Sequence, residues 1–160
     1  MASSSGQSFR RPEPVPSRVH RPSDKDDLIQ AIIDNAPFAT MASALLFAAA
    51  VGRANQCRVP FDKGQELLWE PFANAGAGPF LDMLAAAVSD DKDILAGDRD
   101  DERVQIFEEY ANGGLEIIQD RLTARGGTPL EALLSLTLEF EEEHDVGEVN
   151  LEELAQRLAQ

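Results

Sequence analysis

The sequence has very few of the residues that most metal and catalytic sites need. Cys57 is the only cysteine, and His20 and His144 are the only histidines. A single cysteine excludes an internal disulfide and every multi-cysteine zinc or iron–sulfur site. Any chemistry that depends on imidazole would have to use one of the two histidines. The near absence of cysteine also favours a reducing compartment, and we predict a cytoplasmic protein.

Long apolar runs and aromatic residues are scarce as well. The longest apolar run, Ala44 to Val51, is far shorter than the ~20 residues needed to span a bilayer. No basic-then-apolar leader follows Met1, so we expect neither export nor a membrane anchor. With 6% aromatic and 43% apolar residues, the core should consist of alanine and leucine packed between helices.

Basic residues are outnumbered by acidic ones, and the two are unevenly distributed. Fourteen Lys and Arg stand against 29 Asp and Glu, a net charge of −15. Residues 1–25 nevertheless hold five basic and two acidic side chains, whereas residues 26–160 hold nine and 27. The acidic part excludes general affinity for nucleic acid or anionic lipid and favours a basic protein surface as partner.

Motifs that carry chemistry are also missing. The sequence has no Gly-x-Ser-x-Gly elbow, no phosphate-binding loop and no dinucleotide fingerprint. The acidic run at 90–102 has the wrong spacing for a calcium loop, which needs alternating ligands, a central glycine and a terminal glutamate in order. We interpret the run at 139–145 as a solvated helix end. We therefore predict no catalytic residue, no metal site and no cofactor, and expect that the protein is not an enzyme.

The order of segments predicts a mainly α fold. Residues 1–16 are rich in proline and serine and should form a disordered basic arm, followed by a single α-helical domain over 17–160. Hydrophobic spacing and capping residues predict a compact domain of about five to seven helices and allow one short two-stranded element. The expected helices cover 24–34, 40–51, 79–88, 104–122, 128–141 and 150–158.

Some positions make these predictions specific. Gly52 is placed to close the second helix in a left-handed conformation. Gly113 and Gly114 fall inside the long helix, so either the helix breaks there or a neighbouring backbone approaches closely. Short extended segments are expected at 18–21 and 58–61, and Thr128 with Glu131 forms a capping box.

Basic residues in the N-terminal part suggest a contact surface. Arg10, Arg11, Arg18, His20 and Arg21 precede two helices separated by a short turn. This order matches that of ribbon–helix–helix DNA-binding proteins, in which strand side chains enter the major groove of DNA. These residues could thus contact DNA, most simply in a dimer, or a partner protein; the oligomeric state stays open.

Four segments together resemble the DNA phosphorothioation (Dnd) system-associated protein 4 family: Val19–Leu28, Phe38–Gly52, Arg58–Phe61 and Phe107–Ile118. The most distinctive parts are Phe-Ala-Ala-x-x-Gly and Glu-Tyr-Ala-Asn-Gly-Gly, and neither is a catalytic motif. As structural signature residues the resemblance marks Phe47, Gly52, Tyr110, Asn112, Gly113 and Gly114. It implies a bacterial system that replaces a phosphate oxygen of DNA by sulfur, or that restricts DNA without this mark.

Two functional hypotheses follow. The first is a non-catalytic accessory protein of such a modification, restriction and phage-defence system, whose acidic helical body contacts a basic surface of a partner. The second is a small DNA-binding protein or repressor that uses the basic N-terminal half.

Overall fold

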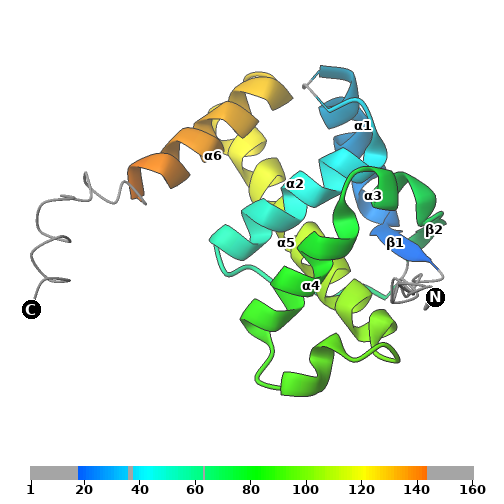
Figure 1. Ribbon diagram of the computed structural model, residues 1–160. Helices are drawn as coiled ribbons and strands as arrows, with labels where there is room; N and C mark the ends of the chain where they lie inside the picture. Colours follow the sequence, from blue (N-terminus) through cyan, green and yellow to red (C-terminus); the bar gives the residue numbers. More distant parts are fainter. Residues whose placement is uncertain (1–17, 36–37, 63, 144–160) are drawn as a thin grey trace, which may run out of the picture.

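The structure, a computed structural model, describes residues 18–35, 38–62 and 64–143. The predicted disordered arm, with Arg10 and Arg11, and the predicted last helix after Asn150 lie outside these residues, as does His144. In the part described, six α-helices and one two-stranded antiparallel sheet confirm the mainly α prediction (Figure 1). The elements are β1 (Val19–Pro22), α1 (Asp26–Asn35), α2 (Met41–Ala54), β2 (Gly64–Leu67), α3 (Glu70–Asn74), α4 (Ala77–Val88), α5 (Asp100–Arg125) and α6 (Pro129–Glu143).

The centre of the fold is the crossing of α2 and α5, which overlap in the middle of Figure 1 and share the most extensive helix–helix contact. A Cβ atom added to Gly114 would lie 1.7 Å from the carbonyl oxygen of Ala48, and one on Gly52 2.1 Å from that of Tyr110. Neither position has room for a side chain. The long helix therefore does not break at its glycines; they admit the backbone of α2 instead.

The expected role of Gly52 was wrong. This glycine lies inside α2, which continues to Ala54, and the left-handed residue after the helix is Gln56 with φ 51°. The side-chain amide of Asn55 donates to the carbonyl oxygen of Val51 at 2.9 Å at the end of the helix. Gly52 is thus required for close packing rather than for helix termination.

The segment 58–61 is not a strand, contrary to expectation. Its polar backbone groups are satisfied by α5: Val59 N–H donates to the carbonyl oxygen of Glu109 at 3.0 Å, and Asn112 Nδ2 donates to the carbonyl oxygen of Val59 at 3.0 Å. A Cβ on Gly113 would lie 2.1 Å from the carbonyl oxygen of Cys57. Asn112 and Gly113 therefore hold this connection against α5.

The extended segment predicted at 18–21 is confirmed as β1, and its partner strand is one that the sequence did not indicate. β1 pairs antiparallel with β2, and Val19 lies opposite Leu67. Val19 is fully buried, which anchors the sheet to the helical core. The sheet thereby comes to rest against the N-terminal half of α5 (Figure 1).

Two helices begin at threonine caps, one of which was predicted. The Thr40 side chain accepts a hydrogen bond from Ser43 N–H, and α2 begins at the next residue. At α6, Thr128 N–H donates to Glu131 Oε2 at 2.9 Å while Glu131 N–H donates to Thr128 Oγ1 at 3.3 Å. This reciprocal pair is the predicted capping box.

Candidate functional site

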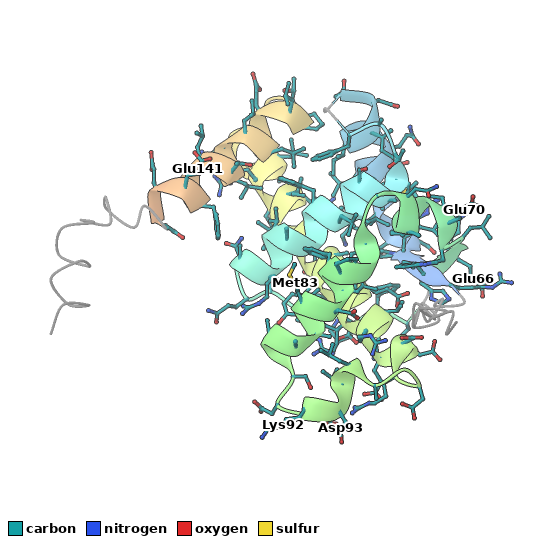
Figure 2. The ribbon with its side chains drawn as sticks, viewed as in Figure 1. Glu66, Glu70, Met83, Lys92, Asp93 and Glu141 are labelled. Atoms are coloured by element: carbon teal, nitrogen blue, oxygen red, sulfur yellow. The ribbon has the colours of Figure 1, made fainter. Side chains whose placement is uncertain are left out.

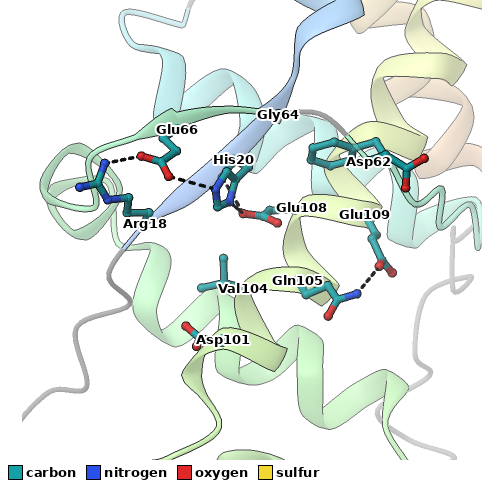
Figure 3. A pocket seen from close by; sticks show the side chains of 11 residues that line it. Arg18, His20, Asp62, Gly64, Glu66, Asp101, Val104, Gln105, Glu108 and Glu109 are labelled. Carbon is teal, nitrogen blue, oxygen red and sulfur yellow. Dashed lines mark hydrogen bonds and ion pairs between the residues drawn. The ribbon is translucent and has the colours of Figure 1, made fainter.

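A charged cleft of about 660 Å³ opens between the sheet and the N-terminal half of α5. Figure 3 shows side chains from the sheet, the connection before β2 and α5 surrounding it. We call it the acidic cleft, because five carboxylates line it. Its lining residues are Arg18, His20, Phe61, Asp62, Gly64, Glu66, Asp101, Val104, Gln105, Glu108 and Glu109.

One side of the cleft is a single face of α5. Asp101, Val104, Gln105 and Glu108 are spaced three or four residues apart and therefore lie on the same side of the helix. The opposite wall is the sheet, with Arg18 directly before β1, His20 in β1 and Glu66 in β2 (Figure 3). Strand alternation directs such residues to one face of the sheet.

Glu108 and His20 join these two walls. Glu108 Oε1 accepts a hydrogen bond from the backbone N–H of His20 at 2.5 Å and lies 3.0 Å from Nδ1 of its ring. The ring nitrogen Nε2 lies 3.8 Å from Glu66 Oε1, and Glu66 also pairs with Arg18. A chain of polar contacts, from Arg18 through Glu66 and His20 to Glu108, thus crosses the rim of the cleft.

Burial also affects the Glu108 carboxyl. Its side chain is 12% exposed, and burial raises the pKa of the Glu108 carboxyl, while the hydrogen bonds from His20 oppose this rise. A desolvated carboxylate attracts an incoming cation more strongly than one in water. Burial and the contacts from His20 thus act on the same carboxyl in opposite directions.

Glu109, next to it, is buried and fully engaged. Its carboxylate pairs with Arg58 and accepts a hydrogen bond from Gln105 Nε2 at 2.9 Å. The Arg58 guanidinium also lies 6.0 Å from the ring centroid of Tyr110. By contrast, Asp62 and Asp101 are exposed at the edge of the cleft, and within the described chain no ion pair involves either.

The structure places three of the predicted contact residues at β1, with Arg18 directly before the strand and His20 and Arg21 in it, but each already has an acidic or polar partner. Arg18 pairs with Glu66 and His20 with Glu108, and Arg21 Nη1 lies 2.7 Å from Asp26 Oδ1. Their charge is therefore largely compensated inside the protein.

Both edges of β1 are also in use. One pairs with β2 of the same chain, and on the other the His20 N–H is bound by the Glu108 side chain. A ribbon–helix–helix dimer needs this strand free to pair with a second copy and its side chains free to contact DNA. The arrangement observed thus argues against the ribbon–helix–helix alternative.

The acidic run at 90–102 is held by arginines from its own region. Arg99 pairs with Asp91 and Glu102, and these bonds hold the pKa of both carboxyls below its usual range. Arg103 is 5% exposed and donates to the carbonyl oxygens of Ile94 and Ala96 at 2.7 and 2.9 Å. Within the described residues no group of three His, Cys, Asp or Glu is arranged to hold a metal ion.

The structural signature residues of the family have packing roles. Phe47 packs against Phe38 with ring centroids 5.0 Å apart, and Tyr110, Asn112, Gly113 and Gly114 belong to the buried crossing. Burial raises the pKa of the half-buried Cys57 thiol, which disfavours the reactive thiolate.

Sequence reasoning missed the carboxylates of the acidic cleft. The spacing of Asp101, Gln105 and Glu108 on a predicted helix could have revealed one wall. Nothing local indicated that Glu66 would join them, because Gly64–Leu67 has neither β-branched residues nor polar–apolar alternation.

The fold and the cleft define a small, mainly helical protein with a short two-stranded sheet and an acidic cleft. The family model for DNA sulphur modification system-associated protein 4 matches residues 18–155, and the chain belongs to this family. No curated protein and no solved structure matches the chain. In the described residues no helix is long and apolar enough to cross a membrane.

Proposed function

We propose that this protein is a non-catalytic accessory component of a DNA phosphorothioate modification or restriction system, and that its acidic cleft docks a basic segment of a partner protein. Membership of the family supports the setting. The observation that carries the docking role is the charge of the cleft, where five carboxylates face a space whose basic side chains, Arg18 and His20, are already in contact with Glu66 and Glu108. Lysine or arginine side chains of a partner would fit both its size and its charge.

The non-catalytic role is part of the same proposal. The described lining offers a histidine–glutamate pair but contains no serine, threonine, cysteine or lysine that the pair could activate. Glu108 also binds the backbone of β1, so its geometry serves to hold the sheet.

A salt-dependent pull-down from the native host tests the proposal. We expect the tagged protein to recover a component of the modification or restriction machinery at low salt and to lose it at high salt, because exposed charge attraction is screened within about 8–10 Å near physiological ionic strength. Replacing both exposed cleft carboxylates, Asp62→Asn with Asp101→Asn, should reduce recovery several-fold. Replacing two exposed aspartates outside the cleft, Asp93→Asn with Asp98→Asn, makes the same charge change and should leave recovery unaltered.

Two results would contradict the proposal: no such component at low salt, or equal losses for both variants. Retardation of duplex DNA with a steep salt dependence that Arg18→Ala abolishes would favour the DNA-binding alternative instead.

A further inference from the structure

The outward side of α6 carries a row of exposed leucines. Leu130, Leu134 and Leu138 are 37%, 53% and 58% exposed, and their four-residue spacing places them along one side of the helix. The leucines that attach α6 to the rest of the protein, Leu133 and Leu136, lie on a different side and are buried. The helix therefore has two apolar sides, of which the described chain covers one.

The charges of α6 are unfavourable for an isolated helix end. The helix has five glutamates and no lysine or arginine: Glu131, Glu139, Glu141, Glu142 and Glu143. Negative charge near the C-terminal end of a helix opposes its dipole. Arg121 and Arg125 of α5 compensate Glu139, but in the described part of the chain no cation pairs with the last three glutamates.

We propose that this side of α6, defined by Leu130, Leu134 and Leu138, docks an amphipathic helix of a partner protein whose apolar stripe is flanked by lysine or arginine. Such a helix would bury the leucines and place positive charge beside the glutamates. A single partner would thus cover the exposed leucines and compensate the glutamates, both of which are unfavourable when α6 is free.

Charge favours such a partner over a parallel pairing with a second copy of this chain. Placing two α6 helices side by side in the same direction would bring their C-terminal glutamates together, with no cation on either helix. Like charges at such an interface are repulsive, whereas lysine or arginine on the partner helix compensates the glutamates.

This surface is separate from the acidic cleft. α6 and the sheet lie on opposite sides of Figure 1, and Figure 2 labels Glu66 at the sheet and Glu141 towards the far end of α6. This inference and the proposed function both involve a basic protein partner. Because they concern different surfaces, an experiment can refute one and leave the other standing.

The test uses the full chain and a synthetic helical peptide with a leucine stripe flanked by lysines, measured by fluorescence anisotropy near physiological ionic strength. Leu134→Gln with Leu138→Gln should weaken binding about tenfold or more, because two buried apolar side chains are lost. The matched control replaces two exposed apolar residues elsewhere, Leu68→Gln with Met83→Gln, which are 72% and 66% exposed, and should bind as the unaltered chain does. Glu141→Gln with Glu142→Gln should weaken binding and reduce its dependence on salt.

Several outcomes would overturn the inference. A peptide with glutamates in place of the lysines could bind equally well, or the α6 leucine variant could bind as tightly as its control. Sedimentation could also reveal a dimer that only Leu134→Gln with Leu138→Gln dissociates, which would assign the surface to a second copy. Peptide binding that is lost only in the Asp62→Asn, Asp101→Asn variant would place it in the acidic cleft and leave the proposed function standing. Circular dichroism checks that each variant is folded.

Discussion

Two faces of α5 serve opposite purposes. Towards the core the helix presents Phe107, Ala111, Gly114, Leu115 and Ile118, all of them buried. Towards the sheet, the same helix presents the acid and amide groups of Asp101, Gln105 and Glu108 around an open space. The first face depends on close contact between uncharged groups, which neither pH nor salt alters. The second depends on charge, and the rigid crossing holds its carboxylates in place.

Breaking the crossing should have the largest effect. In Gly114→Ala the new methyl group would overlap the carbonyl oxygen of Ala48, so the two helices must separate, although alanine is the better helix former. We expect a loss of about 2–4 kcal/mol in the free energy of unfolding, measured with urea and circular dichroism. Gly78→Ala in α4 is the control, because nothing lies within 4 Å of the added atom. Equal stabilities of the two variants would show that α2 and α5 do not cross this closely.

Replacing the buried Glu108 should have an intermediate effect on the free energy of unfolding, and this effect should depend on pH. Burial raises the pKa of Glu108 in the folded protein above its unfolded value of about 4.5, so its contribution to stability is fully present below that value and is lost as the pH rises through the folded pKa. The wild type should therefore lose stability relative to Glu108→Gln between acid and neutral pH, by about 1.4 kcal/mol for each unit of the rise. Urea unfolding of both proteins across this range measures the difference. A difference that stays constant with pH would mean that Glu108 is not desolvated.

The smallest effect on stability is expected for replacing Arg99, the surface arginine that pairs with carboxylates of the acidic run at 90–102. Arg99→Ala removes ion pairs that lower the pKa of Asp91 and Glu102, so their contribution is present above the unfolded pKa of the carboxyls and is lost as the pH falls. This pH dependence is opposite in sign to that of Glu108. The variant should differ only slightly from wild type at neutral pH and low salt, and not at all in acid or high salt. Thermal unfolding at the two salt concentrations checks this, and an undiminished difference at high salt would contradict a surface role.

Features that depend on residues close by in the sequence were predictable from it. The capping box at Thr128, the helix start near Thr40 and the strand around Val19 were expected and are present. For Gly113 and Gly114 the two alternatives were recognised, and the close approach of another backbone is the one that occurs.

The errors concern residues whose role depends on a distant segment. Gly52 looks like a helix terminator until α5 lies against it, and 58–61 looks like a strand until Asn112 and Glu109 take its hydrogen bonds. The acidic cleft was missed for the same reason, since Glu66 and Glu108 are far apart in the chain.

By itself the sequence determined where α1, α2, α4, α5 and α6 form, the excess of negative charge and the family resemblance, because these depend on local backbone preferences and composition. Only the tertiary structure decided that β1 pairs with β2, that Arg18, His20 and Arg21 are neutralised within the chain, and that carboxylates from three segments surround one cleft. Net charge is a sum over residues and carries no position, whereas binding depends on where in space each charge lies and what already compensates it.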